Sequence, residues 1–79
     1  QLLAAELAYR LSLWQQSVTY FERAEAAEPL APDQEFYLAV ALYKSGEQSA
    51  AEQRLERCLP RIRPSNFVQF WSARIRGDG

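Results

Sequence analysis

A chain of 79 residues, of which 48% are hydrophobic and 24% are charged, has the composition of one small folded domain and not of a disordered segment. Its formal net charge of -1 excludes a general attraction to nucleic acid or to an anionic membrane. Histidine is absent and Cys58 is the single cysteine, which excludes an internal disulfide and removes the commonest general base and metal ligand.

The first part of the chain contains two segments with apolar residues at helical spacing. Residues 2–11 form the first segment and residues 13–27 the second, with a light break at Ser12. Pro29 and Pro32 end this pair, because proline cannot continue the interior of a helix. The sequence therefore predicts a helix–turn–helix unit here.

Three further helical segments follow. The third begins near Asp33, a first-turn acid or cap, and stops at Gly46, where a left-handed cap is usual. The fourth covers residues 50–59, and the fifth follows Ser65, a good N-cap, and reaches Ile75. Since no stretch alternates with period two for long enough to form a strand, we predict an all-α domain of about five helices.

Two short stretches of the chain are nearly the same. Residues 7–12 read LAYRLS and residues 41–46 read ALYKSG. The matching positions are all 34 residues apart: Leu7 and Ala41, Ala8 and Leu42, Tyr9 and Tyr43, Arg10 and Lys44, and Ser12 and Gly46. Self-similarity at a fixed period indicates a repeat architecture, in which each helical pair buries its apolar face against its neighbour.

The 34-residue period and the residue types at several positions resemble the tetratricopeptide repeat. Small residues stand in both copies where the paired helices of that family approach closely: Ala5, Ser17 and Ala24 in the first copy, and Ala39, Ala51 and Cys58 in the second. Phe21 and Leu55 stand at the bulky position beside them. Both copies depart from the family's pattern at its tryptophan place, where they hold Gln1 and Glu35.

The resemblance implies a domain layout and a shape. It places one repeat at residues 1–31, a second at residues 32–64 and a capping helix at residues 65–76, within a single domain that covers residues 1–79. It also implies a short right-handed α-solenoid whose concave wall, formed by the first helix of each pair, holds a partner peptide. Because methionine is absent even from the first position, we expect the chain to be a fragment of a longer one.

The family's inner-wall positions, carried over to this chain, give a candidate binding site. The candidate residues are Tyr9, Arg10, Phe36, Tyr37, Val40, Tyr43 and Lys44. The resemblance implies that Tyr9–Arg10 and Tyr43–Lys44 lie side by side on neighbouring helices, as two aromatic–basic pairs in one groove. Tyrosine and arginine are favoured at binding hot spots, so a partner with an apolar segment flanked by acids would suit this wall. The alternative is that these tyrosines only pack between adjacent helices.

No residue pattern in the chain predicts catalysis. Cys58 lacks a base partner and stands at a position that favours a small buried residue, so we expect it to have a packing role. Glu22, Glu25 and Glu28 recur every three residues along one helix, which is typical of a solvated face. We therefore predict a non-catalytic protein without a metal or a cofactor.

The resemblance thus favours a protein-interaction module, a scaffold or adaptor that binds a protein or peptide partner. Two alternatives are a structural spacer that self-associates through the ends of its repeats, and a regulatory domain of a larger enzyme or transcriptional regulator. Nucleic-acid binding is a weaker alternative, through the five arginines near the C-terminus: Arg57, Arg61, Arg63, Arg74 and Arg76. No membrane partner is expected, since no apolar run approaches the length of a membrane span. No signal peptide is visible, which leaves the cytoplasm as the default compartment, and the composition suggests a bacterial source.

Overall fold

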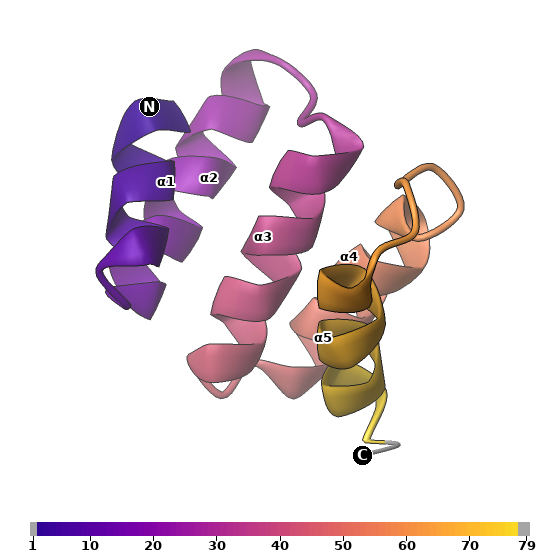
Figure 1. Ribbon diagram of the computed structural model, residues 1–79. Coiled ribbons are helices and arrows are strands. Elements are labelled where there is room, and N and C mark those ends of the chain that lie inside the picture. Colours follow the sequence, from indigo (N-terminus) through magenta and orange to yellow (C-terminus); the bar gives the residue numbers. More distant parts are fainter. Residues whose placement is uncertain (1, 78–79) are drawn as a thin grey trace.

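The computed structural model describes residues 2–77, and these residues form five α-helices and no strand (Figure 1). The helices are α1 (Leu2–Arg10), α2 (Trp14–Ala27), α3 (Pro32–Lys44), α4 (Gln48–Cys58) and α5 (Asn66–Arg76). The predicted all-α fold is therefore confirmed for this part of the chain. None of these five helices is long and apolar enough to cross a membrane.

The helices are arranged in two layers (Figure 1). α1, α3 and α5 run in the same direction in one layer, and α2 and α4 run back behind them. α1 pairs with α2 and α3 with α4, while α2 also packs on α3, and α5 packs on both α3 and α4. Each helical pair is thus joined to the next, with α1 at one end of the molecule and α5 at the other.

Small and bulky residues alternate in the core in the same way in both pairs. Ser17 and Ala51, which are 34 residues apart, are both fully buried, and so are the bulky Phe21 and Leu55 one turn later. The hydroxyl of Ser17 donates a hydrogen bond of 3.0 Å to the carbonyl oxygen of Ala5, so the polar atom at this close helix contact is satisfied. The 34-residue correspondence therefore extends from the sequence to the packing of the helices.

The repeated stretch that the sequence shows twice is the C-terminal turn of α1 and of α3. Ser12 and Gly46 both adopt a positive φ, of 60° and 88° respectively. Each donates its backbone N–H to a tyrosine carbonyl at 3.0 Å, Ser12 to Tyr9 and Gly46 to Tyr43. These contacts belong to the left-handed ending that commonly terminates a helix. The matching residues are therefore explained by a matching local conformation.

The starts of α3 and α5 are fixed by local caps. Pro32 is the first residue of α3, a position where proline costs no backbone hydrogen bond, and Asp33 lies in the first turn, as the sequence predicts. The side chain of Gln34 accepts a hydrogen bond of 2.9 Å from the backbone N–H of Ala31. At α5, the Ser65 hydroxyl accepts the Val68 N–H at 3.1 Å, which confirms Ser65 as the N-cap.

Candidate binding groove

A pocket of about 400 Å³ opens on the layer formed by α1, α3 and α5. Its lining comes from all three helices: Glu6, Tyr9 and Arg10 from α1, Asp33 and Tyr37 from α3, and Phe67 from α5. The structure thus brings three of the predicted site residues, Tyr9, Arg10 and Tyr37, together around one cavity.

The floor of this groove is a chain of aromatic rings. The ring centroid of Tyr37 lies 4.8 Å from that of Tyr9 and 5.9 Å from that of Phe67, so the rings link α1, α3 and α5. Trp14, at the start of α2, continues the chain at 5.5 Å from Tyr9 in an edge-to-face contact. Burial, and to a smaller extent the neighbouring Tyr37, raises the pKa of Tyr9 to about 12, so Tyr9 is a neutral hydroxyl at physiological pH.

A second aromatic cluster lies further along the same helices. The ring centroid of Tyr43 on α3 is 6.2 Å from that of Trp71 on α5, and Trp71 is 5.2 Å from Phe70. The Lys44 ammonium lies 5.4 Å from the ring centroid of Trp71 and 5.9 Å from that of Trp14, within the range of a cation–π contact. Lys44 thus stands between the two aromatic groups.

Two aromatic contacts between neighbouring helices of this layer, α1 with α3 and α3 with α5, are equivalent by the 34-residue repeat. Tyr9 contacts Tyr37, and the residues 34 positions later, Tyr43 and Trp71, contact each other in the same way. From the sequence, Tyr9–Arg10 and Tyr43–Lys44 were expected to lie side by side on neighbouring helices, as two aromatic–basic pairs in one groove. In the structure, each tyrosine has an aromatic neighbour on the next helix of the same layer, Tyr37 on α3 for Tyr9 and Trp71 on α5 for Tyr43.

Phe36 and Val40 are core residues and not groove residues. Val40 is fully buried and Phe36 is buried against the ring of Phe67, at a centroid distance of 5.6 Å. α3 is contacted by α2, α4 and α5, so most of its surface is covered. Phe36 and Val40 therefore offer no surface to a partner and act by supporting the groove from below, which corrects the expectation for these two positions.

Charges of opposite sign occupy different parts of this surface. Arg10, Lys44 and Arg74 lie in the last turns of α1, α3 and α5, which run in the same direction, so their charges complement the C-terminal dipole of each helix. Asp33 lies in the first turn of α3, and Glu6 lies one turn before Arg10. The groove is thus acidic toward the helix starts and basic toward the helix ends.

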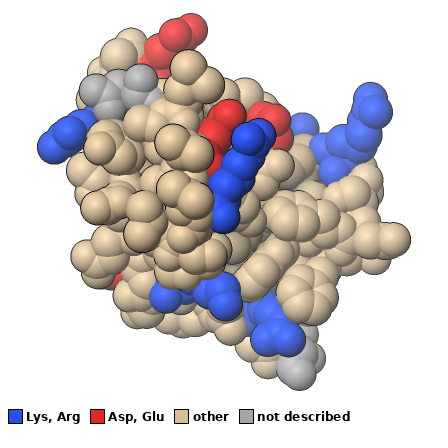
Figure 2. Space-filling view, turned by 60° about the vertical axis from the view of Figure 1, so that its left-hand side comes forward, with Lys and Arg blue, Asp and Glu red and all other residues tan. Residues whose placement is uncertain are grey.

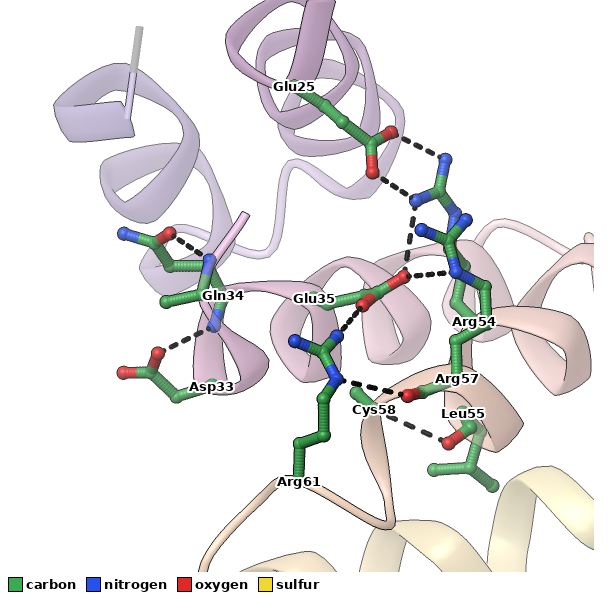
Figure 3. A network of polar contacts seen from close by, with 10 residues as sticks. Glu25, Asp33, Gln34, Glu35, Arg54, Leu55, Arg57, Cys58 and Arg61 are labelled. Atoms are coloured by element: carbon green, nitrogen blue, oxygen red, sulfur yellow. Dashed lines mark hydrogen bonds and ion pairs between the residues drawn. The ribbon is translucent and has the colours of Figure 1, made fainter. Parts of the chain in front are cut away.

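Sequence reasoning missed an ion-pair cluster around Glu35, which has only 1% of its surface exposed (Figure 3). Its carboxylate lies 2.9 Å from the Arg61 guanidinium and 3.3 Å from those of Arg54 and Arg57. Arg54 also pairs with Glu25, with one of its two contacts at 2.8 Å. These partners are 19 to 29 residues apart in the chain, so helical spacing alone could not reveal them.

The cluster changes the interpretation of two charged segments. Glu25, expected on a solvated face, is paired across α2 and α4, and the hydrogen bond from Arg54 lowers the pKa of Glu25. Arg57 and Arg61, two of the five arginines considered for nucleic-acid binding, are directed at Glu35. Part of the basic charge near the C-terminus is therefore neutralised within the fold.

Cys58 is buried at the end of α4, with its sulfur 3.6 Å from the carbonyl oxygen of Leu55. Burial raises the pKa of the Cys58 thiol to about 11, and the negative charge of Glu35 adds to this effect. A protonated, buried thiol is a poor nucleophile and suits the expected packing role. Within residues 2–77, no group of three or more histidine, cysteine or acidic side chains is placed to hold a metal ion.

Comparison of the chain with known protein families, with curated proteins and with solved structures gave no match.

Proposed function

We propose that the chain is a non-catalytic protein-interaction module of the tetratricopeptide type, which binds a partner peptide in the groove formed by α1, α3 and α5. The observation that carries this proposal is the pocket of about 400 Å³ with a floor of linked aromatic rings. Three of its six lining residues are aromatic and three are charged, so the pocket offers both apolar contact and polar groups to a partner, as binding sites do. Tyrosine and tryptophan supply a large contact area there with few rotatable bonds.

The distribution of charge suggests the chemistry of the partner. Lys44 and Arg74 lie at the basic end of the surface, beside the second aromatic cluster, whereas Glu6 and Asp33 lie at the acidic end. A peptide with aromatic or aliphatic side chains over Tyr37, and with an acidic residue directed toward Lys44, would match both features. Such a module would serve as a scaffold or adaptor, alone or as the regulatory part of a larger enzyme or transcriptional regulator.

The test is a selection of peptides from a displayed library of random short sequences on the immobilised wild-type protein. Enriched peptides are then synthesised with a fluorophore, and their dissociation constants are measured by fluorescence anisotropy. We expect Lys44→Glu and Phe67→Ala each to weaken binding by about tenfold or more, which corresponds to about 1.4 kcal/mol. Arg23→Glu is the matched control, because Arg23 is an exposed basic residue on α2, in the other layer.

Circular dichroism spectra of all variants must first match that of the wild type. The proposal is wrong if the library yields no enriched sequence. It is equally wrong if the enriched peptides bind Lys44→Glu and Phe67→Ala as tightly as they bind Arg23→Glu.

A further inference from the structure

α1 carries an apolar face that nothing in residues 2–77 covers. Leu3, Leu7 and Leu11 are 84%, 56% and 60% exposed, and Leu13, two residues further along the chain, is 44% exposed. Leu3, Leu7 and Leu11 follow one another at intervals of four residues, so on a helix they form one stripe about 12 Å long. Leu11 belongs to this stripe because its N–H still donates to the Leu7 carbonyl oxygen at 3.0 Å. We call Leu3, Leu7, Leu11 and Leu13 the leucine face.

The internal repeat allows the leucines of α1 to be compared with the corresponding residues of α3. The residues of α3 that correspond to Leu3, Leu7 and Leu11 are Tyr37, Ala41 and Ser45. None of these three is exposed: Ala41 is fully buried, and Tyr37 contacts the rings of Tyr9 on α1 and Phe67 on α5, whereas α1 lies at the end of the molecule with an open side (Figure 1). The corresponding residues of the second pair are thus covered at least in part by neighbouring helices, whereas the leucine face has no helix upon it within residues 2–77.

The large side chain at Leu7 distinguishes this face from the α3 surface. Ala41 is small and fully buried at the corresponding position of α3. A leucine there holds a neighbouring helix further away and favours interdigitation with other large apolar side chains. A second leucine stripe is thus a better complement than a helix placed as α2 is placed on α3.

The opposite end of the molecule has a different character. Leu38 and Leu42 of α3 are buried, and the residues 34 positions later, on α5, are Ser72 and Arg76. Ser72 is itself buried and Arg76 is exposed, and the exposed residues of α5 also include Phe70, so the end formed by α5 mixes polar and apolar side chains, while the end formed by α1 is apolar. Head-to-tail stacking would join two unlike surfaces, whereas a two-fold symmetric contact joins a surface to its own copy and closes the assembly.

We propose that the leucine face binds the leucine face of a second copy of this chain, with the two α1 helices antiparallel. The charges beside the leucine face determine the relative direction of the two α1 helices. Glu6 and Arg10 lie one turn apart on the same flank of the leucine stripe. An antiparallel pair brings this flank of both helices together, so that Glu6 faces Arg10 of the second copy and Arg10 faces its Glu6.

Figure 2 brings the α1 side of the molecule forward and shows a broad area without charged side chains, with basic and acidic groups around its margin. Uncharged surfaces rimmed by charges are typical of protein–protein contact sites. None of the four leucines of the leucine face lines the peptide groove, whereas Glu6 and Arg10 at its flank line that pocket as well.

The test is the mass of the wild-type protein by sedimentation equilibrium over about 5 to 500 μM, a range suited to micromolar dissociation constants. We expect the mass to approach twice the 9.1 kDa of one chain. Leu7→Glu should keep the mass at that of one chain throughout, since Leu7 is exposed and its replacement leaves the core intact. Phe70→Glu is the matched control, because Phe70 is exposed to a similar degree on α5, and it should associate like the wild type.

A charge exchange tests the antiparallel geometry. Glu6→Arg and Arg10→Glu should each weaken association about tenfold, and the double variant Glu6→Arg/Arg10→Glu should restore it, because the reciprocal pairs form again with their signs reversed. A wild type that keeps the mass of one chain at the highest concentration would overturn the proposal. So would association that survives Leu7→Glu, a mass that rises beyond two chains, or a double variant no better than the single ones.

Discussion

Ser12 and Gly46 occupy the same position at the ends of α1 and α3, but the backbone conformation of that position costs serine more than glycine. Both residues have a positive φ. Glycine adopts this conformation without steric cost, whereas the Cβ of serine comes too close to the backbone. A Cβ added at Gly46 meets no atom within 4 Å, so the conformation of the backbone alone distinguishes the two residues.

We expect Ser12→Gly to stabilise the fold by about 0.5–1 kcal/mol, the relief of left-handed strain less the greater freedom that glycine gives the unfolded chain. The reciprocal change Gly46→Ser should destabilise it by about 1 kcal/mol. Urea unfolding followed by circular dichroism measures both values. A Ser12→Gly variant that is less stable than the wild type would show that the Ser12 side chain makes a contribution of its own.

Glu35 is the residue whose charge matters most to the fold, because it is buried and three arginines are directed at it. Replacement by glutamine keeps the shape and removes the charge. Since Arg54 retains Glu25 as a partner and the side chains of Arg57 and Arg61 can turn to solvent, we expect Glu35→Gln to cost about 2–3 kcal/mol, below the full cost of breaking a buried pair.

Two controls separate burial from charge in this experiment. Arg61→Gln removes an exposed partner and should cost at most about 1 kcal/mol. Glu22→Gln removes an exposed acid on α2 and should change the free energy of unfolding by less than about 0.5 kcal/mol. If Glu35→Gln costs no more than Glu22→Gln, the cluster is not a stabilising feature at neutral pH.

The pair between Glu25 and Arg54 links stability to pH in a defined direction. Because the hydrogen bond from Arg54 lowers the pKa of Glu25 in the folded state, the pair stabilises the fold above the ordinary pKa of a glutamate. This contribution is lost as the pH falls through the lowered pKa.

The thiol of Cys58 affects stability at alkaline pH instead. Its raised pKa favours the fold below the ordinary pKa of a cysteine, and this contribution is lost as the pH rises toward about 11.

At the scale of the elements, local signals predicted more than long-range ones. Helical periodicity predicted five helices, and the cap at Ser65 and the stop at Gly46 agree with the structure because each depends on residues within one turn. Periodicity identifies the apolar side of a helix, but it does not tell how many neighbours a helix will have. α3 is covered by α2, α4 and α5, so Phe36 and Val40 became core residues although they lie close to Tyr37 in sequence.

The residues of the groove were predictable only in part. The inner-wall positions that the family resemblance implies included Tyr9, Arg10 and Tyr37 on the first helices of two pairs, and these residues line one pocket. Trp14 could not be assigned to this surface from its spacing, because it begins α2, which belongs to the other layer. The cluster around Glu35 escaped prediction because its charges come from three helices and a loop, and only the packing of α3 against α4 brings them together.

At the scale of the whole molecule, the end of the stack formed by α1 differs from the covered helices, because its leucines are exposed. A domain of this size has a small core, and the leucine face leaves part of its apolar surface in water. Burying that face in a dimer would therefore add stability that one chain alone does not have. Because a dimer that forms only from folded chains shifts the unfolding equilibrium by mass action, stability then depends on protein concentration.

We expect the midpoint of thermal unfolding of the wild type to rise by about 5 °C or more when the protein concentration is raised about a hundredfold, as the linkage relation and the typical unfolding entropy of a small domain imply. Leu7→Glu should unfold at the same midpoint at both concentrations, and Phe70→Glu should behave like the wild type, because only the first substitution lies on the leucine face. Differential scanning calorimetry at the two concentrations measures the shift. A wild-type midpoint that does not move would mean that the folded chain gains nothing from a second copy, and the leucine face would then have no role in self-association.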